Sequence, residues 1–151
     1  MISVFVYGLD QFLVGDLSVQ LGKDLAKLYE VDEDDINFVA PSTMVFHKRA
    51  EQTSWRVIVE VSVPKKLEVL QEQAQEVIVY HIKQIAIHVE ILFKYYLIDH
   101  HYLEINDDYP LYLEEQPDVE IEAEYPDDIE EGEGEDEIYT GDIFEGLKKN
   151  G

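Results

Sequence analysis

The chain has 151 residues, of which 46% are hydrophobic, so it is long enough to form one domain with a substantial core. Its formal net charge of −23, from 34 acidic and 11 basic residues, excludes a conventional nucleic-acid binder, whose affinity comes from neutralising phosphates. The absence of cysteine excludes disulfides, cysteine-ligated zinc, iron–sulfur clusters and thiol catalysis, and it fits a cytoplasmic protein.

The first predicted unit is a strand followed by a helix. Residues 2–7 (ISVFVY) form a short apolar strand, and no basic region precedes it, so we expect neither a signal peptide nor a membrane span. Gly8 marks the turn after this strand. Asp16 is placed to cap a helix that should end near Tyr29. The apolar face of the helix consists of Leu17, Leu21, Leu25 and Leu28.

An acidic loop and a second strand follow. Residues 32–35 (DEDD) are interpreted as a solvated loop, because a metal site needs ligands that converge from several segments. Residues 36–47 predict a strand that Pro41 interrupts, since proline lacks the donor that a central strand needs. Residues 47–54 then form a polar connector to the second unit.

The second unit repeats the order of the first. Residues 55–63 alternate between apolar and polar, which predicts a strand that Pro64 ends. Residues 67–85 carry apolar side chains at three- and four-residue steps, which predicts a helix, and residues 87–96 return to strand alternation. The sequence therefore predicts an α+β, two-layer sandwich built from duplicated β-α-β units.

The last third of the chain differs from the rest in charge. We expect a core domain in residues 1–105 and an acidic, largely disordered tail in residues 106–151. Residues 97–105 should form a short strand or helix that completes the core domain. Residues 104–151 hold 19 of the 34 acidic residues but only two of the 11 basic residues. Aromatic and aliphatic residues between the acids are typical of segments that order on a basic or grooved partner, so a basic protein partner is predicted. A solubilising tail is the alternative.

The order β-α-β-β-α-β leaves two folds open. In the ferredoxin-like sandwich, two helices cover one face of an antiparallel four-stranded sheet. In the tautomerase fold, each β-α-β unit contributes a pair of parallel strands, and a pseudo-twofold axis relates the two pairs. Periodicity alone does not separate these folds.

Four passages carry a resemblance to a known family: residues 2–8, the leucine helix of residues 17–28, residues 31–38 and residues 41–43. They resemble the tautomerase superfamily, which includes macrophage migration inhibitory factor, and in particular an uncharacterised bacterial branch without the N-terminal proline. The similarity covers roughly residues 1–96. It implies a tautomerase-like scaffold and, if the chain is an enzyme, a tautomerase or isomerase that acts on enol or keto acids.

The residue on which this superfamily's chemistry rests is different here. The resemblance implies an N-terminal proline whose secondary amine is the general base or nucleophile, whereas position 2 of this chain is Ile2. We expect the bulky Ile2 to leave Met1 in place. An α-amine titrates nearer neutral pH than a lysine does, so Met1 is the catalytic candidate, and proline-based activity is not expected.

An anionic ligand near Met1 would need cations. Lys48, Arg49 and Arg56 are the candidate ligand-binding residues, because a guanidinium group offers a fork of donors that fits a carboxylate. Each also has a simpler interpretation. Lys48 and Arg49 belong to a surface connector, and Arg56 can pair with Glu60 or with an acid on a neighbouring strand.

The histidines do not predict a metal site. His81 lies on the apolar face of the second helix, where a hydrogen-bonded histidine is more common than a ligand. Residues 99–101 (DHH) are adjacent, and neighbours on a strand point in opposite directions, so a third ligand such as His47 or His88 would be needed. We predict neither a metal nor a cofactor.

The last predicted strand is apolar on both faces, since Leu92 and Tyr96 lie opposite Val89 and Ile91. Such a strand needs cover on both sides, and two helices cover one side, so we predict a homo-oligomer, with a trimer favoured by the resemblance. Two functions follow. The chain is a tautomerase-like protein without proline-based activity that binds a small anionic ligand between subunits, or it is an interaction module whose acidic tail binds a basic partner.

Overall fold

The computed structural model describes residues 1–114. Residues 1–105 form a compact unit that contains every helix and strand of the described part of the chain. The predicted disorder of residues 106–151 concerns mainly residues outside the described part. The strands are β1 (Ile2–Tyr7), β2 (Ile36–Val39), β3 (Phe46–His47), β4 (Ala50–Glu51), β5 (Arg56–Pro64) and β6 (His88–Tyr96), and the two α-helices are α1 (Gln11–Tyr29) and α2 (Gln71–Ile82).

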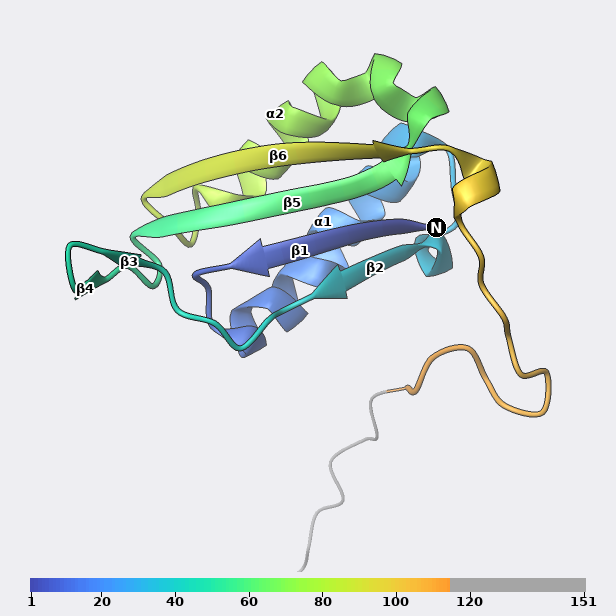
Figure 1. Ribbon diagram of the computed structural model, residues 1–151, viewed down its shortest axis with the longest axis horizontal. Coiled ribbons are helices and arrows are strands. Elements are labelled where there is room, and N and C mark those ends of the chain that lie inside the picture. Colours follow the sequence, from blue (N-terminus) through green and yellow to red (C-terminus); the bar gives the residue numbers. More distant parts are fainter. Residues whose placement is uncertain (115–151) are drawn as a thin grey trace, which may run out of the picture. The chain divides into compact units, whose positions relative to one another are not determined.

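The four longer strands form one sheet in the order β2-β1-β5-β6 (Figure 1). Each β-α-β unit contributes a parallel pair, β1 with β2 and β5 with β6. The pairs meet antiparallel at the centre, where Ser3 lies opposite Ser62 and Tyr7 opposite Ile58. The ferredoxin-like alternative is wrong, because its neighbouring strands are all antiparallel and its first two strands are not adjacent.

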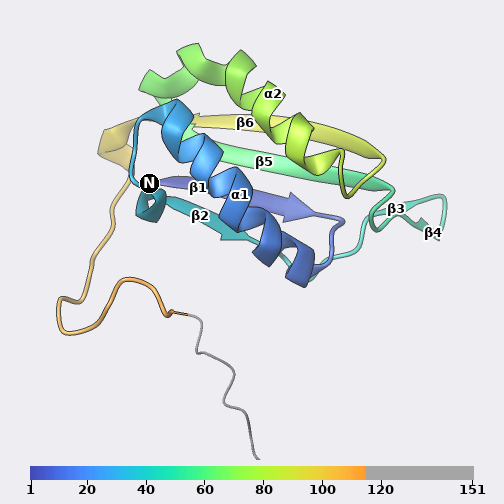
Figure 2. The ribbon, with the colours of Figure 1, turned by 180° about the vertical axis from the view of Figure 1, so that it is seen from behind.

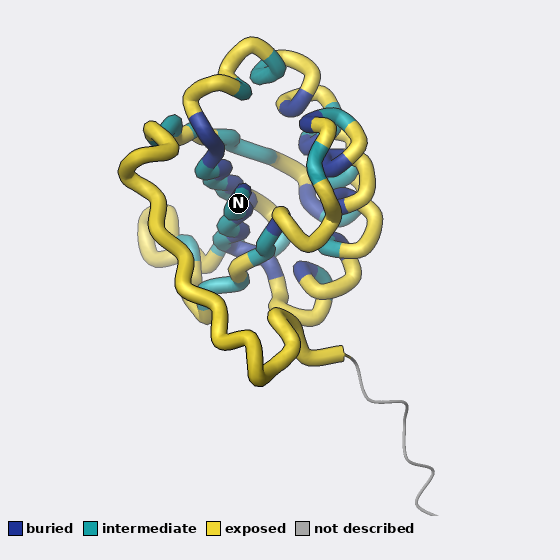
Figure 3. Tube along the Cα trace, turned by 90° about the vertical axis from the view of Figure 1, so that its right-hand side faces the viewer, coloured by how far each residue is buried: buried dark blue, intermediate teal, exposed yellow. Residues whose placement is uncertain are grey.

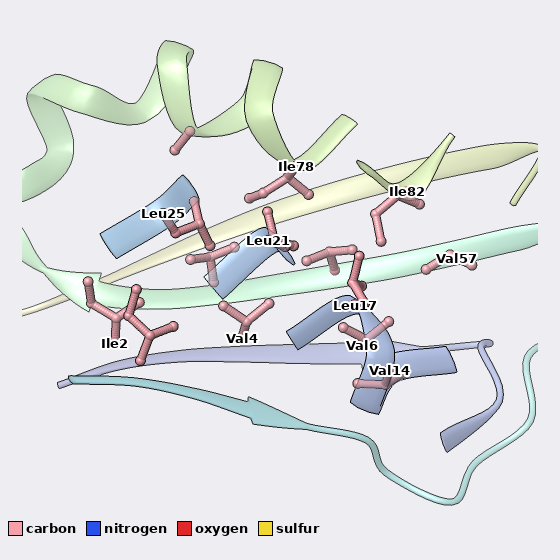
Figure 4. Packing of buried hydrophobic residues seen from close by; sticks show 14 of the residues in the cluster. Ile2, Val4, Val6, Val14, Leu17, Leu21, Leu25, Val57, Ile78 and Ile82 are labelled. Carbon is pink, nitrogen blue, oxygen red and sulfur yellow. The ribbon is translucent and has the colours of Figure 1, made fainter. Parts of the chain in front are cut away.

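The two helices lie on one face of this sheet, and the buried core lies between them and the strands (Figures 2 and 3). Alternate residues of β1 and β5 point into it, and the helices supply leucine and isoleucine (Figure 4). Burying each such side chain contributes roughly 1.5–3 kcal/mol. The largest fully buried side chains are those of Ile2, Val4, Val6, Leu21, Leu25, Val57, Val59, Val61, Val63, Ile78 and Ile82.

Helix α1 begins earlier than the sequence predicts. Its N-cap is Asp10, whose backbone is extended and whose carboxylate accepts a hydrogen bond from the backbone N–H two residues on at 2.9 Å. Residues 11–15 are already helical, so Asp16 lies within the helix and does not cap it. The prediction was wrong because Val14, only 3% exposed, extends the apolar face by a further turn. The end at Tyr29 is as predicted.

Three other segments differ in detail from the prediction. Pairing of β2 with β1 stops at Val39, before Pro41. The last two residues of the predicted strand form β3, which pairs with β4, in the predicted connector, as a separate two-stranded sheet. The helix predicted over residues 67–85 is divided into a 3-10 helix, Lys65–Leu70, and α2. Residues 97–105 contain a 3-10 turn at Ile98–His100.

Candidate functional site

A cavity of about 230 Å³ lies at the end of the sheet where β1 begins and where β5 and β6 end. Four parts of the chain meet there: the N-terminus, the segment between α1 and β2, the 3-10 helix after β5, and the segment after β6. The cavity is lined by Met1, Ile2, Val31, Asp35, Pro64, Lys66, Leu67, Tyr96, Ile98 and His101.

Met1 is held at this cavity by two side chains that the sheet brings together. The Tyr96 hydroxyl, at the end of β6, donates a hydrogen bond to the Met1 carbonyl oxygen. The Asn37 amide, on β2, donates to Met1 Sδ at 2.7 Å. The Tyr96 ring stacks on His101 with centroids 5.4 Å apart. The carbonyl and the thioether of Met1 are thus engaged, which leaves the amine as its third polar group at the cavity.

The charges around Met1 are mixed. Burial raises the pKa of Tyr96, and the nearby Asp35 carboxylate raises it further, so the phenol stays protonated and able to donate well above neutral pH. Lys66 and His101 line the same cavity and provide cationic or hydrogen-bonding groups. An anionic group could bind here through ammonium donors, beside an apolar wall.

The three cations predicted from the sequence do not reach this cavity within one chain. Lys48 and Arg49 are exposed and form the turn of the β3–β4 hairpin, with φ of 46° and 73°. Arg56 pairs with Glu90 on β6, so the expectation that it binds a cross-strand acid is confirmed. Eight residue steps of β5 separate Arg56 from Pro64 at the cavity, which is roughly 26 Å at about 3.3 Å per residue.

Sequence reasoning missed Lys66, Tyr96 and His101 as neighbours of Met1. Each is close to the end of a strand that pairs, directly or through β5, with β1. An antiparallel partner of the first strand must end beside the N-terminus. The two lysines after Pro64 were therefore the feature of the sequence that could have predicted a cation near Met1. Using it required knowing that β5 lies next to β1, which periodicity does not show.

His81 links the two helices. Its Nε2 lies 2.7 Å from Asp24 Oδ2 on α1, as expected for a hydrogen-bonded histidine. Within residues 1–114, no group of three or more histidine and acidic side chains is arranged to hold a metal ion. The helices of that same region are all too short or too polar to cross a membrane.

No family model and no curated protein matches the chain, whereas solved structures do. A domain of unknown function (DUF1904) from Sebaldella termitidis ATCC 33386 matches with a TM-score of 0.62 and 21% identity, over 69% of this chain and 96% of that one. A macrophage migration inhibitory factor-like protein from Entamoeba histolytica matches with a TM-score of 0.55 and 7% identity, over 68% and 93%. A fused 4-OT described as an asymmetric trimer matches with a TM-score of 0.51 and 10% identity, over 67% and 91%. The chain has the tautomerase superfamily fold.

Position 2, where the resemblance implies a proline, holds a residue of the core. Ile2 is 1% exposed and points into the core between β1 and the helices (Figure 4). It therefore serves packing, and the polar groups at the cavity come from Met1 and its neighbours. The resemblance inferred from the sequence is confirmed for the fold.

Proposed function

We propose that this tautomerase-fold chain binds a small anionic ligand in the cavity at Met1 and does not perform a proline-based reaction. The cavity carries the proposal: it combines Met1 and Lys66 with an apolar wall in a volume of about 230 Å³. A carboxylate would accept charge-assisted hydrogen bonds from the two amines. Tyr96 positions the backbone of Met1. Ile2 stands at position 2, where the resemblance implies a proline.

Titration of an enolpyruvate-type acid by calorimetry tests this site. We expect Lys66→Ala to weaken binding at least about tenfold, because a hydrogen bond to a charged group contributes roughly 1.5–3 kcal/mol. Lys65→Ala is the matched control, since Lys65 pairs with Glu68 at 2.5 Å and does not line the cavity. Equal effects of the two substitutions would refute the site. Tautomerisation faster than in buffer would show that the cavity is catalytic without the proline.

We further propose that the chain assembles as a homo-trimer through the face of the sheet that the helices leave open. Apolar side chains on this face include Phe5, Tyr7 and Ile58, which are half-buried, and Leu92, which is 46% exposed. One of the similar structures is described as a trimer. Light scattering on the full chain should give three times 17.6 kDa, and a mass of 17.6 kDa would contradict the proposal.

The charge distribution favours a second function, an interaction module. Nineteen of the 34 acidic residues lie in residues 104–151, which suits binding to a basic protein. Capture of such a protein should fall as salt is raised, because screening weakens charge pairs. Capture that is unchanged after deletion of residues 107–151 would rule this function out.

A further inference from the structure

The end of the sheet opposite Met1 carries a second surface, which the proposed function does not use. Strands β5 and β6 begin there, and the β3–β4 hairpin projects beyond the sheet (Figure 1). A hollow of about 450 Å³ is lined by residues 53–55 and 83–87. We call this hollow and the adjoining hairpin, residues 46–51, the hairpin-end surface.

Large apolar side chains are exposed on the hairpin-end surface. Trp55, Ile87 and Phe46 are 57%, 56% and 59% exposed. Trp55 is also held in place: its carbonyl accepts a hydrogen bond from His88 N at 2.9 Å, and its ring packs edge-on against the His88 ring with centroids 5.8 Å apart. The hollow thus offers a fixed aromatic wall to an apolar side chain.

Basic groups on this surface lack acidic partners. Within residues 1–114, Lys48, Arg49 and Lys83 form no ion pair. Arg56 balances the charge of Glu90 in an ion pair. Glu51 keeps its negative charge, although it accepts a hydrogen bond from a backbone N–H two residues on at 2.7 Å, so the three basic residues outnumber it. The surface is therefore locally positive in a chain whose net charge is −23.

The backbone is strained where these cations lie. Lys48, Arg49 and Ser54 have φ of 46°, 73° and 60°, and they are three of the four non-glycine residues with positive φ in the described chain. A two-residue hairpin turn of this kind favours asparagine or glycine. Lysine and arginine occupy it instead, which places two cations side by side at the tip. Strain of this sort is concentrated at functional sites.

We propose that the hairpin-end surface binds an acidic polypeptide segment that carries an aromatic or branched aliphatic side chain. Carboxylates pair with Lys48, Arg49 and Lys83, and the apolar side chain enters the hollow against Trp55. A small anion would leave Trp55 and Ile87 without a partner. A nucleic acid would need a longer basic stripe than three cations.

A labelled peptide with the sequence of residues 118–145 is the probe, because this stretch contains acids, tyrosine and isoleucine but no lysine or arginine. Trp55 is the chain's one tryptophan, so its emission reports on the hollow. Added to the full chain, the peptide should change Trp55 emission saturably. We expect binding to weaken at least tenfold between about 0.05 and 0.5 M NaCl, and at least tenfold in the Lys48→Glu/Arg49→Glu double variant.

The control variant is Lys23→Glu/Lys27→Glu, which makes the same change in net charge on exposed positions of α1. Equal weakening by both variants would overturn the proposal, because only overall charge would then matter. So would equal binding of a peptide whose tyrosines, isoleucines, phenylalanine and valine are replaced by serine, or of a short oligonucleotide. Salt alone, without peptide, would change Trp55 emission if the chain's own acids competed for this surface. If this response were absent in the Lys48/Arg49 variant, the result would support the proposal. None of these outcomes bears on the Met1 cavity.

Discussion

Replacing Ile2 by proline should damage the core without creating activity. The Ile2 side chain is 1% exposed and lies between β1 and the helices. Truncating a buried isoleucine to alanine costs about 2–5 kcal/mol, and a proline ring, whose direction the backbone fixes, refills little of that space. One kcal/mol corresponds to roughly 4–8 °C for a domain of this size, so we expect the Tm of Ile2→Pro to fall by at least about 8 °C.

Thermal and urea unfolding of the full chain, followed by circular dichroism, measures this effect. Ile2→Ala should lose about 2–5 kcal/mol and Ile2→Val about 0.5–1.5 kcal/mol, so the series separates lost volume from the proline itself. Val19→Ala is the control, since Val19 is 52% exposed on α1. If Ile2→Pro unfolds within about 2 °C of the wild type, or gains activity toward an enolpyruvate-type acid, the reasoning about position 2 is refuted.

Three further predictions use groups elsewhere in the core unit. Burial, with a smaller contribution from Tyr95, raises the pKa of Tyr29 from 10.0 to about 12. The folded state is therefore most stable below pH 10, and about 2–3 kcal/mol of the free energy of unfolding is lost as the pH rises through 12. Tyr29→Phe should remove this loss, as measured by urea unfolding at each pH. Gly8→Ala should destabilise the folded state by at least about 1 kcal/mol, because φ is +77° and the new Cβ would lie 2.7 Å from a carbonyl oxygen. Gly15 lies in α1 with open space around it, so Gly15→Ala should stabilise the folded state by about 0.5–1 kcal/mol. Tyr96→Phe should cost about 0.5–1.5 kcal/mol, because the hydrogen bond to the Met1 carbonyl is lost.

Each of these predictions has a contradicting result. An unchanged alkaline stability profile in Tyr29→Phe would place the titrating group elsewhere. A Gly8→Ala variant at least as stable as the wild type would mean that the turn at Gly8 does not require positive φ, and a destabilised Gly15→Ala variant would contradict the open space at that position. A Tyr96→Phe variant as stable as the wild type would show that this hydroxyl contributes nothing at the N-terminus.

The sequence determined the local structure of this protein. Alternation in residues 55–63 and the leucine spacing of α1 depend only on near neighbours, and they fixed the strands, the helices and their buried faces. The boundaries were less certain for the same reason: Val14 extends α1 toward Asp10 only because the sheet gives it a surface to pack against. The resemblance in residues 1–96 added the choice of fold, which periodicity had left open.

The tertiary structure decided which strands are neighbours and hence what surrounds Met1. Backbone hydrogen bonds between strands are made by the same groups in every residue. The sequence of one segment therefore does not predict that β1 pairs with both β2 and β5. That pairing brings Lys66 and Tyr96, distant in the sequence, to the N-terminus. It also carries Arg56 to the far end of the sheet, beside the hairpin that holds Lys48 and Arg49. The length of β5 therefore separates Met1 from the cations that the sequence predicted as its neighbours.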